Sequence, residues 1–491
     1  MPAEFRTLLR ARFPLIWLNT TEEERAVEIA CEVATAQGDA VAGWSQTWGL
    51  HDVPGMPSAG AHPDPMSLLK HIRGSERRTI WLLKDLGVLC STHNLPLARA
   101  LADTAMAARE HGSILVCINT MGGQPELLQG IAAVHSLSLP TAEEHAAQLS
   151  EIAGQLQVKI LAEDRRTLSL ACLGLTLQQA ENIWARVRAS GGHFTAADTT
   201  QVLREKARIV RSTGYLEFIP ASRMDEVGGL DRLKAWIVRR GLGFSEAARE
   251  IGLPYPRGVM LVGVQGCGKS LIARAVAGAW QQPLLRMDVG SLMDSLVGSS
   301  ERNLRSALQL AERISPCILW IDEIEKGFSS GGAESDGGTS LRMLGTILTW
   351  MQEKQEPVFL LATANRVSAL PPELMRKGRF DEIFFVDLPD PRQRAAIWGV
   401  HLRARAEASK DAGLMERVDT DLLVSASDGY SGAEIAAAVV EGAFEALAED
   451  APLQGSHIAA ALSASPPLSR TRAEDVAAIR SWARARARAA G

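Results

Sequence analysis

Residues 263–270, Gly263-Val264-Gln265-Gly266-Cys267-Gly268-Lys269-Ser270, fit the pattern GxxxxGK[ST] and decide the fold class. An apolar run at 258–262 precedes them and an amphipathic helical pattern at 271–280 follows, which is the context that this pattern requires. Glycines let the backbone curl so that successive N–H groups point at one phosphate, and the helix N-terminus adds about half a positive charge. We therefore predict a phosphate-binding loop in which Lys269 reaches the β- and γ-phosphates and Ser270 binds Mg²⁺.

Polar residues follow two later apolar runs, each predicted to be a strand. Asp322-Glu323 follows the run 317–321, and Thr363-Ala364-Asn365 follows the run 358–362. Asp322 fits a Mg²⁺ partner that acts through water, because Mg²⁺ keeps much of its hydration shell. Glu323 fits the general base that activates a water molecule, and the Asn365 amide fits a group that positions this water. Each residue alone would also fit an ordinary polar strand end, whereas together with the loop they indicate a hydrolytic site.

Two arginines three residues apart, Arg376 and Arg379, lie in the segment 373–381, ELMRKGRFD. By composition alone, a solvated basic turn is the favoured interpretation. The alternative is that these guanidinium groups reach a phosphate bound by a neighbouring subunit, a role that contributes about 10³–10⁵ in rate.

Two regions alternate short apolar runs with longer helical patterns, as α/β units do. The first has candidate strands at 14–18, 41–45, 79–83 and 113–118, and the second adds 284–287 and 383–386 to the runs above. These runs are apolar on both faces, as parallel strands covered by helices are. We divide the chain into an α/β domain at 1–140, a helical region at 141–203, a polar connector at 204–224, a second α/β domain at 225–390, and a helical lid with a tail at 391–491.

Composition argues against several classes of function. Hydrophobic residues make up 46% and charged residues 22%, as in globular proteins, and the net charge of -5 does not favour binding to nucleic acid or to an anionic membrane. The six cysteines form no CxxC pair, so neither a zinc site nor a disulfide framework is indicated, and a reducing cytoplasm is expected. No uncharged apolar run approaches about 18 residues, so no membrane span is expected.

Five motifs in one order resemble those of AAA+ ATPases of the AAA branch proper. Residues 225–230 (DEVGGL) resemble the segment that leads into AAA domains and packs near adenine. GVQGCGKS resembles their Walker A motif, ILWIDE their Walker B motif, and ATANR with ELMRKGRFD their second region of homology. Residues 428–434 (DGYSGAE) resemble the lid motif at the sensor-2 position. With its N-terminal partner domain, the chain is most similar to the ycf-type AAA ATPases of plastids and cyanobacteria.

The resemblance implies a RecA-like P-loop αβα core with a C-terminal helical lid. It also implies a homo-oligomeric ring, usually a hexamer, with ATP and Mg²⁺ at the subunit boundaries. Asn365 becomes sensor 1, and Arg376 and Arg379 become arginine fingers for the neighbour's ATP. Ala433 stands where other AAA+ branches carry an arginine, which is ordinary in this branch. The resemblance further implies nucleotide contacts by Val227, Gly228, Leu271, Asp322, Gly432 and Ala433.

Two departures from the family pattern concern the pore and the N-terminal region. Threading relatives place an aromatic–apolar–Gly element in the pore, whereas this chain has Leu296-Val297-Gly298, which lacks a flat ring. The Gly/Ser-rich segment 327–340 would lie at the second pore loop and is expected to be mobile. Residues 19–24 (NTTEEE) carry three carboxylates and no GK[ST] where phosphate would bind. We therefore expect a degenerate AAA-like α/β domain that binds no ATP and serves as an adaptor or ring scaffold.

The leading functional hypothesis is ATP-driven remodelling of a protein substrate or complex, which the sequence does not identify. One alternative is a nucleotide-gated assembly or regulatory factor that threads no chain. Another is a nucleic-acid motor, against which the acidic balance and the lack of a recognisable DNA-binding element argue.

Overall fold

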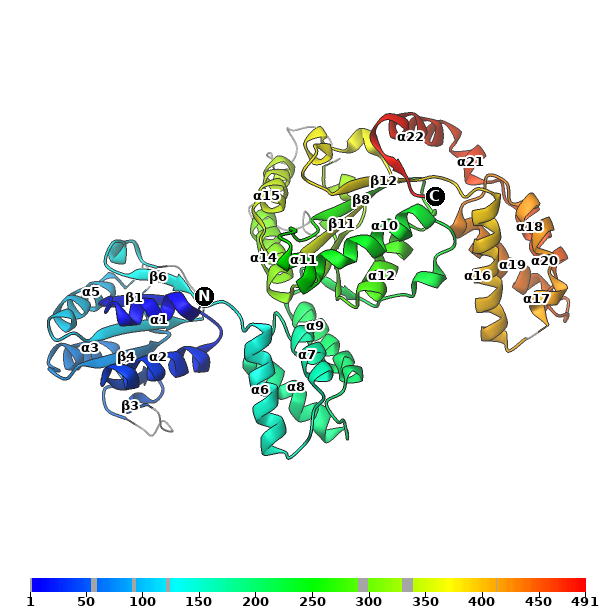
Figure 1. Cartoon of the computed structure of the whole chain (residues 1–491). Helices are drawn as coiled ribbons and strands as arrows, with labels where there is room; N and C mark the ends of the chain where they lie inside the picture. The colour runs from blue at the N-terminus through cyan, green and yellow to red at the C-terminus, as the bar shows by residue number, and fades with distance from the viewer. Residues whose placement is uncertain are drawn as a thin grey trace. The chain divides into compact units, whose positions relative to one another are not determined.

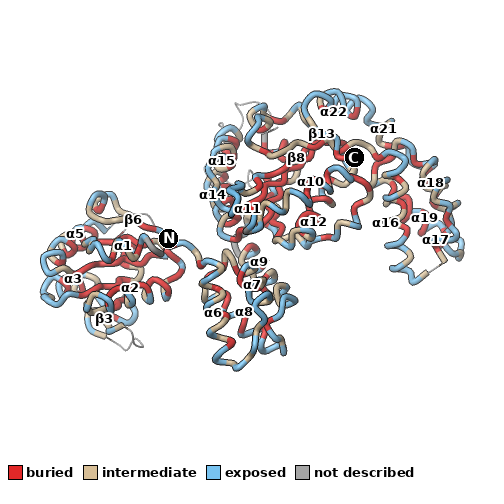
Figure 2. Tube along the Cα trace, viewed as in Figure 1, coloured by how far each residue is buried: buried red, intermediate tan, exposed pale blue. Residues whose placement is uncertain are grey.

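The computed structural model describes residues 2–53, 60–90, 94–120, 124–289, 299–328, 339–411 and 413–491. They form two compact units, Met1–His193 and Phe194–Gly491 (Figure 1). Each unit is built around one sheet whose central strands are buried on both faces (Figure 2). The continuous apolar runs therefore form parallel strands covered by helices, as predicted from the sequence.

The sheet of the second unit has the order β7-β9-β10-β11-β8-β12-β13 when read towards the C-terminal edge strand. Neighbouring strands pair in parallel, except that β7 runs antiparallel to β9. The central strand β11 is buried at every residue. The strands are β7 (Glu217–Ile219), β8 (Gly258–Gly263), β9 (Leu284–Met287), β10 (Cys317–Ile321), β11 (Val358–Ala364), β12 (Glu382–Val386) and β13 (Arg488–Ala489).

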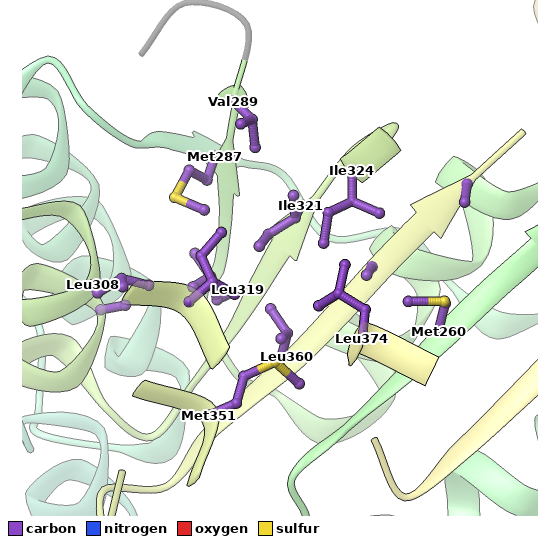
Figure 3. Close-up of a cluster of buried hydrophobic side chains, with 14 of the residues drawn as sticks. Met260, Met287, Val289, Leu308, Leu319, Ile321, Ile324, Met351, Leu360 and Leu374 are labelled. Atoms are coloured by element: carbon purple, nitrogen blue, oxygen red, sulfur yellow. The ribbon is translucent and has the colours of Figure 1, made fainter. Parts of the chain in front are cut away.

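Helices cover both faces of this sheet. Helices α10 (Asp231–Gly241) and α12 (Lys269–Trp280) share one apolar cluster with the strands, and the short α11 (Glu246–Glu250) follows α10. Helices α14 (Ser299–Ile314) and α15 (Thr339–Glu353) share the other cluster. Figure 3 shows side chains of that second cluster, including Met260, Leu319 and Leu360 from three neighbouring strands. The unit thus has the αβα layers of a RecA-like core.

A helical lid with its own apolar core follows the sheet, and Trp398 and Ile435 are fully buried in it. The last two helices, α21 (Leu468–Thr471) and α22 (Ala473–Arg486), return to the sheet subdomain, because Val476 and Ile479 belong to the sheet's cluster. The tail is therefore not part of the lid. The lid helices are α16 (Pro391–Ser409), α17 (Leu414–Arg417), α18 (Thr420–Ala426), α19 (Gly432–Ala448) and α20 (Gly455–Ala464).

The first unit has a sheet of order β3-β2-β4-β5-β1-β6, and among its described strands only β3 pairs antiparallel. Its strands are β1 (Leu15–Asn19), β2 (Ala40–Ser45), β3 (Gly49–Asp52), β4 (Thr79–Lys84), β5 (Ile114–Asn119) and β6 (Ala133–Ser136). Its helices are α1 (Pro2–Arg10), α2 (Glu23–Gln37), α3 (Pro65–Arg73), α4 (Leu86–Leu89), α5 (Leu95–Glu110), α6 (Ala142–Gln155), α7 (Ala162–Ala171) and α8 (Leu177–Ala189).

The two units share one strand topology. The parallel order β2-β4-β5-β1-β6 of the first unit repeats as β9-β10-β11-β8-β12 in the second. In each set of five strands, the first along the chain (β1 or β8) lies between the last two, and a helix follows it directly. This shared order agrees with the predicted fold class, a RecA-like core preceded by a degenerate domain of the same type.

The expected polar connector at 204–224 is instead largely regular structure. Helix α9 (Thr199–Thr213) runs into it, and strand β7 follows. Val202, Lys206 and Val210 are spaced four residues apart and buried, so they form one inward face of the helix. The charged residues between them give this segment its polar composition. For this reason the four-residue spacing of the buried side chains was not recognised as an amphipathic helix.

Candidate functional site

The predicted phosphate-binding loop lies between the buried strand β8 and helix α12. Gly266 and Gly268 have φ angles of 77° and 90°, a left-handed conformation that favours glycine. A Cβ atom on Gly266 would lie 2.9 Å from Oγ of Ser431, whereas one on Gly268 would meet no atom within 4 Å. The loop is therefore packed closely against the lid at Gly266 and has open space at Gly268, as a phosphate cradle requires.

Lys269, the first residue of α12, is 6% exposed. Its ammonium donates hydrogen bonds to the carbonyl oxygens of Gly263, at 2.9 Å, and of Val264, at 2.7 Å. Burial lowers the pKa of Lys269 to about 8. A phosphate would give this ammonium a fully charged partner and raise its pKa, because an opposite charge favours the protonated form. The side chain thus fits the predicted role in binding phosphate.

The two acidic residues after β10 are held by the next strand. Thr363 donates a hydrogen bond of 2.6 Å from Oγ1 to Oδ1 of Asp322, and the Glu323 backbone N–H donates to the same Oγ1 at 2.9 Å. Glu323 has a φ of 48°, which turns the chain sharply at the end of the strand. Thr363 therefore fixes the Asp322 carboxylate and the Glu323 backbone at the edge of the sheet where the phosphate loop lies. Sequence reasoning gave Thr363 no such role.

Asn365 lies against the predicted base. Its Nδ2 donates a 2.6 Å hydrogen bond to Oε1 of Glu323, and its backbone N–H donates to Oε1 of the buried Glu325 at 2.9 Å. Within the described part of the chain, the side-chain oxygen of Asn365 is buried without a hydrogen-bond partner. A buried acceptor without a partner is costly, so this oxygen is suited to accept a hydrogen bond from a water molecule.

A cavity of about 380 Å³ connects these groups. Most residues predicted to bind nucleotide line it, whereas Gly263 and Val264 are not among its described lining residues and contribute the carbonyls that accept from Lys269. The arrangement brings together, in one cleft, the side chains predicted to bind phosphate, to bind Mg²⁺ and to activate water. The predicted residues that line it are Val227, Gly228, Gln265, Gly266, Cys267, Gly268, Lys269, Ser270, Leu271, Asp322, Glu323, Asn365, Gly432 and Ala433.

Lid residues that the sequence did not single out also line this cleft. Ile397, Val400 and His401 come from α16, and Ala436 comes from α19. Burial lowers the pKa of His401, which favours its neutral form. Their helical spacing predicts only an amphipathic helix, so nothing in the local pattern could have assigned them to a ligand site.

The two predicted finger arginines lie elsewhere. Neither Arg376 nor Arg379 lines the cleft in the described structure. Arg376 is exposed, whereas Arg379 is partly buried and donates to the carbonyl oxygen of Leu348 in α15. The predicted pore residues Leu296, Val297 and Gly298, and residues 329–338 of the Gly/Ser-rich segment, lie outside the described residues.

Cys267 lines the cleft within the phosphate loop. Burial raises the pKa of its thiol to about 12, so the nucleophilic thiolate is disfavoured near neutral pH. We therefore interpret this cysteine as a small residue of the loop.

The first unit carries the opposite charges at the corresponding place. Glu23 begins α2 just as Lys269 begins α12, and Lys84 ends β4 where Asp322 follows β10. Asp85 and Glu323, the next residues, share a positive φ of 55° and 48°. Nζ of Lys84 lies 3.1 Å from Oε2 of Glu23. The positions of Lys269 and Asp322 in the second unit are therefore taken in the first unit by a glutamate and a lysine that form an ion pair.

A buried carboxylate adjoins this reversed pair. Glu22 is 5% exposed, and its Oε1 accepts a 3.0 Å hydrogen bond from the backbone N–H of Leu177 at the start of α8. Burial raises the pKa of Glu22. Burial thus favours the neutral form of Glu22, and carboxyl side chains occupy the strand–helix turn that would have to receive phosphate.

Comparison with known protein families gives three matches. Residues 259–388 match the ATPase family associated with various cellular activities (AAA). Residues 1–152 match the N-terminal domain of SpoVK-like AAA ATPases, and residues 143–213 match their second domain. No helix within the described residues has the length and apolarity needed to cross a membrane.

Several relatives match the chain along nearly its whole length. The uncharacterized AAA domain-containing protein ycf46 of Guillardia theta is 36% identical over 98% of this chain and 94% of its own. The protein of the same description from Pyropia yezoensis is 35% identical over 98% and 97%. The ATP-dependent zinc metalloprotease FtsH of Acidothermus cellulolyticus is 37% identical, but only over 46% of this chain and 34% of its own.

Proposed function

Because this chain belongs to the ycf46-type AAA ATPases and hydrolyses ATP, we propose that it uses this hydrolysis to remodel a protein substrate or complex. The observation that carries the proposal is the cleft in which Lys269, Glu323 and Asn365 meet between the sheet subdomain and the lid. A nucleotide held there touches both bodies, so its hydrolysis changes how the lid and the sheet subdomain are joined.

In the proposed reaction, Lys269 turns from its own loop carbonyls to the β- and γ-phosphates. Ser270 and Asp322 would hold Mg²⁺, which neutralises charge that develops on the phosphates. Glu323 takes a proton from the attacking water, and the Asn365 oxygen accepts a hydrogen bond that orients this water. The remaining part of the cleft would enclose the adenine ring of the nucleotide. It is lined by Val227 and Gly228 from the segment before α10, and by Ile397 and His401 from the lid.

We propose a homo-oligomeric ring, on the family pattern a hexamer, in which Arg376 and Arg379 act on the neighbour's ATP. Exposed apolar side chains support self-association. Val440, Phe444 and Leu447 form one face of α19 and are 52%, 62% and 73% exposed. Burying such residues against another copy would remove a large apolar area from water.

We propose that the first unit is a scaffold or adaptor that binds no nucleotide. The Glu23–Lys84 pair neutralises the site internally, and Glu22 places a further carboxylate where phosphate would approach. We place the protein in a reducing cytoplasm, which is supported by the finding that its six cysteines, all within the described residues, form no disulfide.

A nucleotide-gated assembly factor is the second candidate, because Leu296 replaces the aromatic residue of threading relatives. Leu296→Ala separates the two functions. Loss of substrate processing with ATPase activity retained supports threading, whereas unchanged processing supports the switch. A nucleic-acid motor stays the weakest candidate, and ATPase stimulation by DNA that disappears at raised salt would favour it.

The substrate can be sought with Glu323→Gln, which should hold ATP without hydrolysing it. The variant is used as bait in ATP, with the same variant in ADP and with Lys269→Ala in ATP as controls. A protein retained only by the first bait is the expected substrate or complex. Identical captures in all three baits would contradict nucleotide-dependent remodelling.

A further inference from the structure

The C-terminal segment, residues 468–491, is fastened to the ATPase core at several points. The backbone N–H of Leu468 donates a 2.8 Å hydrogen bond to Glu434 of the lid motif. Farther along, Nε of Arg480 lies 2.9 Å from both carboxylate oxygens of Asp387, and the Ala490 N–H donates to Phe385 at 3.0 Å. The segment therefore starts at the lid and ends as an edge strand of the sheet.

Between these anchors, the segment reaches the phosphate loop. Arg472, at the junction of α21 and α22, has Nη1 3.4 Å from Oε1 of Gln265 in that loop. Its Nε lies 2.9 Å from the Asp475 carboxylate, which orients the guanidinium. The next loop residue, Gly266, accepts a 2.9 Å hydrogen bond from the Ala433 N–H. The lid motif and the C-terminal segment thus hold two successive residues of the loop.

A second cavity shows which end of the nucleotide cleft Arg472 adjoins. This cavity of about 310 Å³ is lined by Arg472 and Asp475, and also by Gln265, Glu323 and Asn365. The last three residues line the nucleotide cleft as well, so the two cavities meet at the water-activating groups. Arg472 therefore adjoins the end of the cleft where a third phosphate would lie.

We propose that Arg472 is a positioning residue for ATP hydrolysis, which acts through Gln265 to favour nucleoside triphosphate over diphosphate. The guanidinium fixes the side of the phosphate loop that adjoins Glu323 and Asn365, and it adds positive potential at that end. The inference rests on the proposed nucleotide site. Because Arg472 is about half exposed, with its side chain 54% accessible, its effect is moderate.

The test compares full-length Arg472→Ala and Arg472→Lys with the unmodified protein. Arg470→Ala is the control, since Arg470 is an exposed arginine of the same segment that lines neither cavity. Binding of fluorescent ATPγS and of fluorescent ADP is measured with Mg²⁺ present. We expect Arg472→Ala to weaken ATPγS binding by about three- to fivefold with ADP binding unchanged, because a half-exposed charged contact contributes modestly. Arg472→Lys should recover part of this loss, and Arg470→Ala should show none.

A double-mutant cycle combines Gln265→Ala with Arg472→Ala. If Arg472 acts through Gln265, the fold-loss of kcat/KM in the double variant is clearly smaller than the product of the fold-losses in the two single variants. Equal weakening of ATPγS and ADP, or fully multiplicative losses, would overturn the proposal. Intact ADP binding in Arg472→Ala, Arg472→Lys and Arg470→Ala shows that these variants retain the nucleotide site, whereas an unmodified protein that binds neither nucleotide would refute that site first.

Discussion

The side-chain amide of Asn365 donates a 2.6 Å hydrogen bond to Oε1 of Glu323, while the amide oxygen of the same residue is buried without a partner in the described structure. One side chain therefore holds the base and offers an acceptor to water. Lys326 also forms an ion pair with Glu323, from the following turn of the chain. The protein's own side chains therefore hold Glu323 at the sheet edge, which is the preorganisation that general-base catalysis requires.

Replacement of the base should separate binding from turnover. Glu323→Gln keeps the shape of the side chain and removes its proton acceptor, so we expect ATP binding to persist while kcat falls by about 10²–10⁴. Fluorescent nucleotide binding and phosphate release measure the two quantities. Glu353→Gln, at an exposed position of α15, is the control and should match the unmodified protein. Turnover at the unmodified rate in Glu323→Gln would show that another group activates the water.

The pH dependence of ATP affinity should follow Lys269. Its pKa is lowered to about 8 by burial, and a bound phosphate raises it again. Below pH 8 the free protein already carries the ammonium, so affinity is steady. Above pH 8 binding must first take up a proton, so we expect affinity to fall towards about tenfold per pH unit.

Titration calorimetry in two buffers of different ionisation heat measures this proton uptake directly. At pH 8.5 the apparent enthalpy should depend on the buffer, and at pH 7.0 this dependence should largely vanish for the Lys269 proton. An affinity that is constant between pH 7 and 9.5 would contradict the role given to Lys269.

The two arginines of the segment 373–381 should behave differently. Arg376 is exposed and lines no described cavity near the nucleotide, so Arg376→Ala should keep ATP binding and thermal stability but lower turnover, by up to about 10³-fold. Arg379 donates to the Leu348 carbonyl, so Arg379→Ala should also cost about 1 kcal/mol of stability.

Mixing experiments test whether Arg376 acts on a neighbour. Arg376→Ala mixed with Lys269→Ala pairs a subunit that binds ATP with a subunit that supplies the arginine. We expect this mixture to regain part of the activity that each variant lacks alone. Strictly no recovery, in rings shown to have exchanged subunits, would place Arg376 outside the reaction.

The sheets could be predicted from the sequence because their central strands are long and wholly apolar. The runs at 79–83, 317–321 and 358–362 differ from β4, β10 and β11 by at most two residues at one end. Burial on both faces leaves no polar residue to interrupt such a run. The phosphate loop could be predicted for a similar reason, because its glycines and the helix that follows lie within one short stretch of sequence.

The short edge strands could not be predicted, because they depend on partners far along the chain. Arg488–Ala489 lies in a locally basic tail, yet it pairs with β12, and Nη1 of Arg488 lies 3.7 Å from Oε2 of Glu382. A strand of two residues has no period to detect. For the same reason, the contact of Arg472 with Gln265 joins positions 207 residues apart and leaves no local signal.

The number of ATP molecules bound per chain can be predicted from the two sheets. They share one topology, but the side chains at the strand–helix turn where phosphate would bind carry opposite charges. Lys269 has no counterpart in the first unit, where Glu23 takes its place and is paired with Lys84. We therefore expect one ATP per chain, and none in full-length Lys269→Ala, as measured by titration calorimetry with Glu323→Gln as the binding-competent reference. The outcome that would contradict a nucleotide-free first unit is micromolar ATP binding that survives Lys269→Ala, or a ratio of two per chain. Neither result would contradict ATP binding in the cleft of the second unit, because Glu323→Gln tests that cleft independently.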